Sequence, residues 1–595
     1  MSLLAWAAAY SLRFNFEIPA QYKSSMFNAM PLVLVIQGLL SFILGVQRAF
    51  WRFTGLIDLR KLLVSILLST ALISLILFFI QRAAFVPRSV LLLYALNFAF
   101  LTCLARVGYR YIKERRLINF KNEQRNPILI LGAGVAGEKL ARQLQHSRTW
   151  YVAGFLDDDK TKVGGRIHGV KVLGTIENLS QIVKSSEITQ AIMALPSVNH
   201  EVRRKVARNC KLVGIEVLTV PAIEDLASGK LAVSEVRKLE LDDLLGRNPV
   251  HLDKAQLQKY ISGQTIMITG AGGSIGAELS RQVARFSPKL LIFFEISEYA
   301  LYLIETEFKD TYSGVSFASV IGDIRSKVRV EEILREYQPT VVFHAAAYKH
   351  VPLMENQNIK EAVINNVFGT LNLAKSSAKH GVENFVLIST DKAVNPSSVM
   401  GATKRLAEMI CESFRQVGSC SNPNFVVTRF GNVIGSTGSV IPRFQSQIAS
   451  GGPLTVTHPD IKRFFMSISE AAQLVLQAAV LGARGTIFVL DMGKPIRITD
   501  VAKELLRLSG KTEEEIGIIY TGLRDGEKMS EELLADGELL TDVGHPKLKI
   551  AKSRPSDPNF VEQLEKWETT IDQASAYEVR AELKKFVPEY DQNWE

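Results

Sequence analysis

Residues 265–276 read TIMITGAGGSIG, a buried-strand pattern that runs directly into a glycine-rich loop. Glycines in such a loop let the backbone approach a pyrophosphate, and the N-terminus of the following helix favours its negative charge. The next apolar run, Leu290 to Phe294, ends in Glu295, whose carboxylate could accept both ribose hydroxyls and would repel the 2′-phosphate of NADP. The pattern predicts a dinucleotide-binding α/β unit that prefers NAD. Its expected cofactor residues are Gly270, Gly273, Ser274, Ile275, Gly276 and Glu295.

Two further strand ends continue this pattern. One strand ends at Asp323 and Ile324, and the next apolar strand, Val341 to His344, is followed by three small residues. Small residues at such a position let the backbone lie against a cofactor. We therefore add to the expected cofactor residues Asp323, Ile324, Ala345, Ala346 and Ala347.

A cluster of reactive side chains follows the next predicted strand. Residues 384–388 form that strand, and it opens into Thr390, Asp391 and Lys392. The helix that follows carries Met400 and Lys404, which are four residues apart and therefore lie on one face. Side chains of this kind can take up and deliver protons, so we expect the reactive centre here.

The composition limits the other function classes. The chain has 595 residues, 47% of them hydrophobic and 22% charged, with a mean hydropathy of +0.11. This length predicts about four structural units. Lys and Arg outnumber Asp and Glu by 70 to 60 without a long block of like charges, which argues against a nucleic-acid partner. Neither a disulfide framework nor a metal site is expected from the spacing of Cys103, Cys210, Cys411 and Cys420.

The apolar residues are concentrated near the N-terminus. Uncharged runs at 26–46, 62–80 and 89–105 each approach the length of a membrane-spanning helix. A shorter run, Ser2 to Leu12, reads as a span whose beginning is missing. We therefore expect a transmembrane anchor of about four spans over residues 1–120, the first of them incomplete.

Basic residues set the expected orientation of this anchor. They gather around Arg48 and Arg52 and again after residue 105, which predicts an inner-membrane, multi-pass protein with its later domains in the cytoplasm. No ionisable residue interrupts the runs, so they indicate an anchor in membrane lipid rather than a transporter. The alternative is a soluble domain with long buried helices.

Another glycine-rich loop lies earlier in the chain. Residues 128–137 read ILILGAGVAG, a helical pattern follows, and Asp157 lies twenty residues after the last glycine. This order predicts a first Rossmann-like domain over 121–252. Its candidate second nucleotide site consists of Gly132, Gly134, Gly137 and Asp157. The alternative is a structural or regulatory role, because the sequence around Asp157 also reads as a strand end and turn.

The layout resembles the extended short-chain dehydrogenase/reductase superfamily, and specifically the membrane-anchored nucleotide-sugar 4,6-dehydratases of polysaccharide biosynthesis, the CapD-like group. Three stretches carry the resemblance: DLLGRNPV at 243–250, HAAAYKHVP at 344–352 and RFGNV at 429–433. It implies an NAD cofactor, a homo-oligomer, and a catalytic domain over 253–595 with a C-terminal substrate-binding part. The expected fold class is α/β, with N-terminal transmembrane helices followed by two Rossmann-type doubly wound parallel-sheet domains.

The resemblance also implies a reaction. NAD+ takes hydride from sugar C4, the C5 proton is abstracted, water leaves from C6, and the hydride returns to C6. We assign C5 proton abstraction to Lys392, which requires a neutral amine whose pKa is lowered by burial or by Lys404 and Lys349. Asp391 is expected to be the acid at C6. Thr390 would hydrogen-bond the C4 hydroxyl, and Lys404 would bind the nicotinamide ribose.

Met400 departs from the pattern of the superfamily. It occupies the place of the catalytic tyrosine in the Tyr-x-x-x-Lys pair, although long membrane-bound members resemble this sequence in having Met there. A thioether is a poor donor and acceptor for the proton that a tyrosine would transfer. Either Asp391 also takes the C4 hydroxyl proton, through a water molecule, or the site is inactive.

A UDP-sugar is the implied substrate. Arginine suits its pyrophosphate because the planar guanidinium can bond two oxygens at once, although each such residue alone also reads as a surface charge. Residues 522–528 resemble the family's GLRPGEK loop, except that Asp525 replaces the proline and removes its φ constraint. The expected substrate-binding residues are Lys349, His350, Asn432, Arg443, Arg463, Arg524 and Glu527.

The leading hypothesis is an NAD-dependent UDP-N-acetylglucosamine 4,6-dehydratase that makes a UDP-4-keto-6-deoxy-HexNAc for capsule, O-antigen or glycoprotein glycans. A nucleotide-sugar epimerase is the nearer alternative, but it normally needs the tyrosine that Met400 replaces. A non-catalytic membrane scaffold or sensor that binds dinucleotide is the alternative from another class. Replacing Asp391 and Lys392 would abolish turnover in an enzyme and leave a scaffold unaffected.

Overall fold

The structure is a computed structural model of the chain. It describes residues 1–44, 56–81, 86–122, 125–145, 147, 149–184, 188–195, 198, 200–219, 237–238, 250, 252–416, 423–482, 485–534, 538, 540–551, 557 and 559–591. The predicted features at Arg48, Arg52, 243–249 and Cys420 lie outside these residues.

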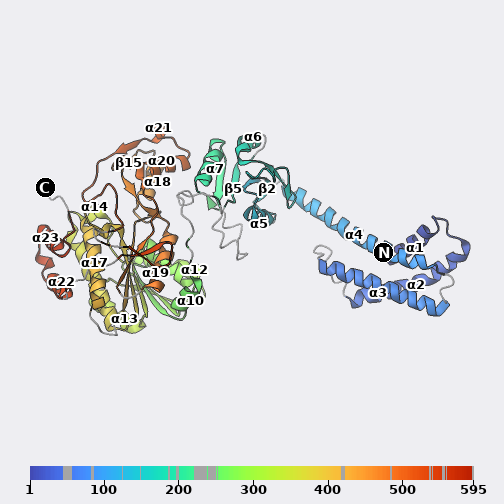
Figure 1. Ribbon diagram of the computed structural model, residues 1–595, viewed down its shortest axis with the longest axis horizontal. Coiled ribbons are helices and arrows are strands. Elements are labelled where there is room, and N and C mark those ends of the chain that lie inside the picture. Colours follow the sequence, from blue (N-terminus) through green and yellow to red (C-terminus); the bar gives the residue numbers. More distant parts are fainter. Residues whose placement is uncertain are drawn as a thin grey trace. The chain divides into compact units, whose positions relative to one another are not determined.

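Within the described residues of the N-terminal part there are four helices (Figure 1): α1 (Ser2–Arg13), α2 (Ala20–Ile43), α3 (Leu56–Gln81) and α4 (Arg88–Asn122). Among the described residues, three stretches are long and apolar enough to cross a membrane, and they fall in the helices that contain the three predicted runs. Helix α1 has only 12 residues, fewer than a span requires. The three stretches are Ala20–Ile43, Arg60–Ile80 and Arg88–Ala105.

A first sheet follows the helices and has the strand order β3-β4-β2-β1-β5-β6-β7. The glycine loop at 132–137 connects β1 to helix α5, as the sequence predicts. The elements are β1 (Asn126–Leu131), α5 (Val135–Leu144), β2 (Trp150–Leu156), β3 (Arg166–Ile167), β4 (Val170–Gly174), α6 (Leu179–Lys184), β5 (Gln190–Met193), α7 (His200–Leu212), β6 (Glu216–Thr219) and β7 (Arg237–Lys238).

A second, larger sheet has the strand order β10-β9-β8-β11-β12-β13-β18-β22-β21. Its first six strands follow the order 3-2-1-4-5-6 of a doubly wound dinucleotide fold, and β22 and β21 add an antiparallel edge. The strands are β8 (Thr265–Thr269), β9 (Leu290–Glu295), β10 (Phe317–Ile321), β11 (Val341–His344), β12 (Asn384–Thr390), β13 (Asn424–Phe430), β18 (Thr486–Leu490), β21 (Leu540–Asp542) and β22 (Leu548–Ala551). The predicted α/β fold class is confirmed.

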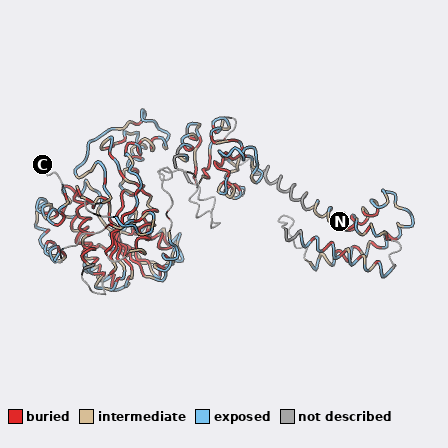
Figure 2. Tube along the Cα trace, in the orientation of Figure 1, coloured by how far each residue is buried: buried red, intermediate tan, exposed pale blue. Residues whose placement is uncertain are grey.

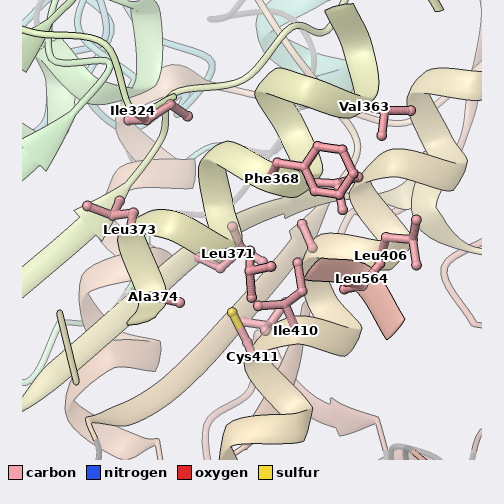
Figure 3. Close-up of a cluster of buried hydrophobic side chains, with 14 of the residues drawn as sticks. Ile324, Val363, Phe368, Leu371, Leu373, Ala374, Leu406, Ile410, Cys411 and Leu564 are labelled. Carbon is pink, nitrogen blue, oxygen red and sulfur yellow. The ribbon is translucent and has the colours of Figure 1, made fainter. Parts of the chain in front are cut away.

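Apolar residues on both sides of this sheet make its core. Every residue of β8 is buried, as is typical of a central parallel strand covered on both faces, and Figure 2 shows buried residues along the strands. On one side, Phe368, Leu371, Leu406 and Leu564 pack together (Figure 3). The helices around the sheet are α10 (Lys254–Ile261), α11 (Ser274–Ala284), α12 (Glu298–Thr311), α13 (Lys327–Tyr337), α14 (Val351–Met354), α15 (Ile359–Val363), α16 (Gly369–Lys379), α17 (Val399–Gln416), α19 (Ile468–Leu481), α22 (Phe560–Glu568) and α23 (Ala576–Phe586).

A small additional lobe is built from segments after β13. It has its own cluster of buried residues, including Phe444, Leu454 and Leu505. This lobe carries Arg463 and the loop 524–531, which line the cavity described below. Its elements are β14 (Asn432–Val433), α18 (Val440–Ala449), β15 (Leu454–Val456), β16 (Lys462–Arg463), β17 (Phe465–Met466), β19 (Ile496–Arg497), α20 (Ile498–Leu508), α21 (Glu513–Ile516) and β20 (Ile518–Tyr520).

Candidate active site

The glycine loop after β8 is closely packed against its own helix. The backbone N–H of Gly270 donates to Phe294 O at 2.8 Å, and a Cβ added to Gly276 would lie only 2.1 Å from Gly270 O. Helix α11 starts directly after this loop at Ser274, with Gly273 as its N-cap. The first N–H groups of a helix lack partners within the helix and favour an anion. The loop therefore fits a pyrophosphate.

Glu295 lies at the end of β9 and braces the same loop. Its Oε2 accepts a hydrogen bond from Gly272 N at 3.0 Å, and its Oε1 accepts one from Ser297 N at 3.1 Å. Glu295 is buried, with 8% of its surface exposed. A carboxylate fixed beside a pyrophosphate loop fits the ribose hydroxyls of NAD.

The other predicted cofactor residues lie on neighbouring strand ends. A Cβ on Gly270 would lie 2.8 Å from Ala346 N, so the backbone after β11 approaches the glycine loop closely, with Ala345 and Ala347 on either side of Ala346. Asp323 follows β10 and pairs with Arg325 at 2.8 Å, while Ile324 is buried in the core.

The residues after β12 form a hydrogen-bonded cluster. Asp391 is 1% exposed, and its Oδ1 accepts hydrogen bonds from Thr390 Oγ1 at 2.9 Å and from Lys392 Nζ at 3.0 Å. Lys392 Nζ also donates to Asn432 Oδ1 at 2.9 Å. Among the described residues, the second carboxylate oxygen of Asp391, Oδ2, has no hydrogen-bond partner. A buried oxygen of this kind can accept a proton or a hydrogen bond from a substrate.

The expectation of a lowered pKa for Lys392 is wrong. Burial by itself would lower that pKa, but the carboxylates of Asp391 and Glu531 outweigh burial and raise it above its ordinary value. Glu531 Oε1 lies 3.7 Å from Lys392 Nζ. The groups that decide the protonation of Lys392 are therefore acids, and not Lys404 or Lys349.

Met400 and Lys404 do lie on one buried face of α17, with 3% and 5% of their surfaces exposed. The side chain of Met400 belongs to the hydrophobic core and is not among the residues that line the cavity described below. Burial lowers the pKa of Lys404 to about 8. His344 is buried between Thr269 and Thr370, and burial lowers its pKa to about 3, consistent with a neutral packing residue.

A cavity of about 230 Å³ lies beside this cluster. Lys392 and Asn432 reach it from the ends of β12 and β13, and burial lowers the pKa of both Lys349 and His350 in its wall. Of the predicted substrate-binding residues, only Arg443 is missing from the wall, because it lies exposed on α18. The side chains from the additional lobe are Arg463, Arg524, Asp525, Glu527, Lys528 and Glu531.

Glu531 is a charged residue of this wall that the motifs do not single out. It lies three residues after the GEK triplet at 526–528, and an acid there reads as surface charge in the sequence. The structure buries it and pairs it with Lys392 and Arg463. Its neighbour Glu532, which is identical in type, stays 52% exposed at its side chain, so sequence alone does not separate the two.

The loop after β14 joins the two halves of the site. The N–H of Thr437 donates to Ser274 Oγ at 3.1 Å, directly at the start of α11. A Cβ on Gly438 would lie 2.3 Å from the imidazole of His350. This loop therefore connects the glycine loop to the cavity wall.

The earlier glycine loop has a related arrangement. Asp157 Oδ2 accepts a hydrogen bond from Ala133 N at 2.6 Å, and Lys162 Nζ lies 3.2 Å from the same oxygen. Burial would raise the pKa of Asp157, but bonds from the Asp159 and Ala133 backbones and from Lys162 lower it. Gly132 and Gly134 flank Ala133, and Gly137 lies in the first turn of α5.

Comparisons with known proteins identify the family of the chain. A family profile described as "Polysaccharide biosynthesis protein" matches residues 266–553, and one described as "CoA-binding domain" matches residues 30–221. The capsular polysaccharide biosynthesis protein CapD of Staphylococcus aureus is 48% identical over 420 residues, which cover 70% of this chain and 70% of that protein.

Two further relatives place the chain more broadly. The probable polysaccharide biosynthesis protein EpsC of Bacillus subtilis is 40% identical over 522 residues, covering 87% of this chain and 86% of that protein. A UDP-glucose 4-epimerase of Rickettsia canadensis is 36% identical over 281 residues, covering 46% of this chain and 79% of that protein. The chain belongs to the CapD-like family of polysaccharide biosynthesis proteins.

Proposed function

We propose that the protein is an NAD-dependent UDP-N-acetylglucosamine 4,6-dehydratase, which makes a UDP-4-keto-6-deoxy-HexNAc for surface polysaccharide or glycoprotein glycans. The observation that carries the proposal is the cluster of Thr390, Asp391 and Lys392 at the end of β12, beside a basic cavity and a pyrophosphate-type glycine loop. Together these parts supply the proton-transfer groups, the substrate site and the cofactor site that the reaction needs.

The residues present fit NAD. The glycine loop and the start of α11 would hold its pyrophosphate, Glu295 its adenosine ribose, and Lys404 its nicotinamide ribose. When bound, NAD supplies a hydride acceptor that returns the hydride in the same turnover. The buried carboxylate of Glu295 disfavours the 2′-phosphate of NADP by charge repulsion.

Asp391 can carry one proton through the whole reaction. Its Oδ2 takes the proton of the C4 hydroxyl as the C4 hydride leaves, and it later delivers that proton to the C6 hydroxyl, which departs as water. The protons then balance without a tyrosine, which accounts for a buried, unreactive Met400. Thr390 would orient the C4 hydroxyl from the same strand end.

Lys392 is proposed to remove the C5 proton and return one to C5 at the end. Because its pKa is raised in the resting site, Lys392 must first lose a proton to solvent through the cavity. Asn432 holds its Nζ in place during this exchange, at 2.9 Å.

The cavity wall supports a nucleotide-sugar diphosphate as the substrate class. Lys349, Arg463, Arg524 and Lys528 give it several cations, and guanidinium groups bind phosphate oxygens in pairs. Glu527 pairs with Arg463 at 3.2 Å and would hold that guanidinium toward the substrate. We include the uridine and the N-acetyl group in the proposed substrate.

The epimerase remains the second candidate because one relative is called a UDP-glucose 4-epimerase. It would use the same cofactor and the same C4 oxidation, but would return the hydride to C4. A buried Met400 leaves this site without the tyrosine that such an enzyme normally uses, which favours the dehydratase. A scaffold or sensor that binds dinucleotide would use the glycine loops alone.

Four further proposals concern the rest of the chain. The apolar helices would anchor it in membrane lipid as a multi-pass inner-membrane protein with cytoplasmic catalytic domains. The Gly132 loop would bind a second nucleotide-type ligand, and the chain would form a homo-oligomer. We also propose that the domains follow the predicted ranges 1–120, 121–252 and 253–595.

Proton NMR of the detergent-solubilised protein with UDP-N-acetylglucosamine and NAD+ in D2O tests the function. A dehydratase produces a C6 methyl signal and incorporates deuterium at C5, whereas an epimerase produces a C4 epimer without a methyl group. Asp391→Asn is the matched control, because it keeps the shape of the side chain and removes the proton acceptor. Folded wild-type protein that leaves the sugar unchanged would refute the proposal for this substrate.

A further inference from the structure

Glu531 is a buried acid placed between two cations of the reaction centre. It is 7% exposed, and its Oε1 lies 3.7 Å from Lys392 Nζ and 3.7 Å from the Nε of Arg463. A buried carboxylate is stable only when cations or hydrogen bonds compensate its charge. Both compensating cations here line the cavity, so the charge of Glu531 is coupled to the site rather than to the surface.

We propose that Glu531 is a positioning residue of this reaction: it holds Lys392 and Arg463 in one arrangement and governs when Lys392 becomes a neutral base. This inference rests on the proposed dehydratase function and adds to it the residue that controls the C5 step. Glu531 acts through Lys392 and is not itself assigned a contact with the sugar.

The contacts of Lys392 support the positioning role. Its Nζ lies 3.0 Å from Asp391 Oδ1, 2.9 Å from Asn432 Oδ1 and 3.7 Å from Glu531 Oε1. Asp391 and Asn432 each accept a hydrogen bond from this ammonium, and Glu531 lies at ion-pair distance from it. Asp391 follows β12 of the large sheet, whereas Asn432 in β14 and Glu531 in the loop 524–531 both belong to the additional lobe. The additional lobe therefore contacts the base through both Asn432 and Glu531.

The charges around Lys392 give the direction of the effect. Asp391 and Glu531 favour its ammonium form, while burial and Arg463 disfavour it. Replacing Glu531 by glutamine removes one negative charge at nearly constant shape, so the neutral amine forms at lower pH. The remaining charged or titratable groups of the cavity wall are Lys349, His350, Arg524, Asp525, Glu527 and Lys528.

The adjacent Glu532 provides a matched control. It pairs with Lys528 at 3.5 Å and accepts a hydrogen bond from Asn395 Nδ2 at 2.9 Å, and its side chain is 52% exposed. Glu532→Gln therefore changes the net charge by the same amount as Glu531→Gln, one residue away, without touching Lys392. Glu531→Asp keeps the negative charge on a shorter side chain.

The test compares the full-length wild type with these three variants in detergent, using the methyl signal at saturating UDP-N-acetylglucosamine and NAD+ over a range of pH. We expect Glu531→Gln to lower kcat by about 100-fold, because a base misplaced by about 1 Å loses rate on that scale. The rising limb of its pH–rate profile should shift to lower pH by roughly one to three pH units. Glu531→Asp should recover part of the rate, and Glu532→Gln should match the wild type. A Glu531→Gln profile that keeps the wild-type midpoint would overturn the inference.

A second measurement decides the inference without turnover. Each variant is labelled with a limiting amine reagent over the same pH range, and modification of Lys392 is quantified by mass spectrometry. If the pH midpoint of Lys392 labelling is lower in Glu531→Gln than in Glu532→Gln, the inference is supported. Equal pH midpoints in the two variants refute it. A wild type that labels as expected but forms no methyl product would instead refute the proposed function. Equal thermal unfolding of the variants shows that the comparison is between folded proteins.

Discussion

In each of the two glycine loops of the chain, a carboxylate accepts a hydrogen bond from a backbone N–H of the loop. The surroundings of the two loops differ. In the larger domain, Glu295 Oε2 accepts a bond from Gly272 N at 3.0 Å, and in the earlier domain Asp157 Oδ2 accepts one from Ala133 N at 2.6 Å. Each acid also accepts a bond from the backbone N–H two residues further on, and Asp157 is additionally paired with Lys162. The same local motif therefore places a carboxylate against the backbone of the loop in both domains. This contact alone does not define a reaction.

The difference lies at the neighbouring strand ends. In the larger domain, the segments after β11, β12 and β13 contribute Lys349, Lys392 and Asn432 to one cavity wall. In the earlier domain, a Cβ on Gly132 would meet Ala194 O and Leu195 Cδ2, so an apolar segment follows the corresponding strand β5. The proposed catalytic chemistry thus depends on residues distant in sequence from the glycine motif.

The largest contrast is expected from the two acids Asp391 and Asp157. Asp391→Asn removes the proposed proton carrier and should lower the rate of methyl formation by about 10³-fold, within the usual range for acid–base residues. Asp157→Asn should leave that rate unchanged. Single-turnover kinetics on both variants measures the difference. Comparable losses in the two variants would show that the earlier loop takes part in the reaction.

A second contrast concerns two glycines of the loops. Alanine at Gly276 would place its Cβ 2.1 Å from Gly270 O, whereas nothing lies within 4 Å of a Cβ at Gly134. We expect Gly276→Ala to destabilise its domain by about 1–3 kcal/mol and to abolish tight NAD binding. Gly134→Ala should change stability by less than about 0.5 kcal/mol. Denaturant unfolding and NAD titration provide the readouts, and a benign Gly276→Ala would contradict the packing described here.

A smaller effect is expected from the buried Lys404. Burial lowers the pKa of its ammonium from the ordinary lysine range to about 8, so the charge is present below that pH and lost above it. NAD affinity of the free protein should therefore fall about two- to fivefold as pH rises through this value, as for loss of a modest ion pair. Calorimetric titration across this range measures it, with Lys404→Met as the variant that should lack the dependence. An identical pH dependence in that variant would remove Lys404 from the cofactor site.

The smallest effect is expected at Met400. Met400→Leu is nearly volume-conserving in the core and should cost less than about 1.5 kcal/mol of stability. Turnover should stay within about twofold of the wild type, because the side chain does not face the cavity. Steady-state kinetics and thermal unfolding test this pair of expectations. A large loss of kcat with normal stability would show that the thioether contacts the substrate or cofactor.

Much of the fold follows from local sequence patterns. The run TIMIT before a glycine loop predicts a central buried strand, and Glu295 is placed by the next apolar run alone. The shared helix face of Met400 and Lys404 follows from their spacing, but spacing does not tell whether that face lines a cavity or a core. Here the core covers Met400.

The protonation of Lys392 depends on tertiary structure. Its acidic neighbour Glu531 lies on a loop far along the chain, so no local pattern predicts a raised pKa. Arg443 and Arg463 show the same dependence, because Arg443 lies exposed on α18 whereas Arg463, from a short strand of the same lobe, is buried in the cavity wall. Local motifs thus predict the strands and loops that carry the site. Long-range packing determines which charged residues line it.

The most direct test of the dehydratase proposal follows one hydrogen atom. UDP-N-acetylglucosamine deuterated at C4 is incubated with the full-length protein and NAD+ in ordinary water, and the product is examined by NMR and mass spectrometry. A dehydratase transfers the deuterium from C4 to the new C6 methyl group of the same molecule. Deuterium that returns to C4 of an epimer, or that stays in unreacted sugar bound to folded, NAD-loaded protein, would contradict the proposal.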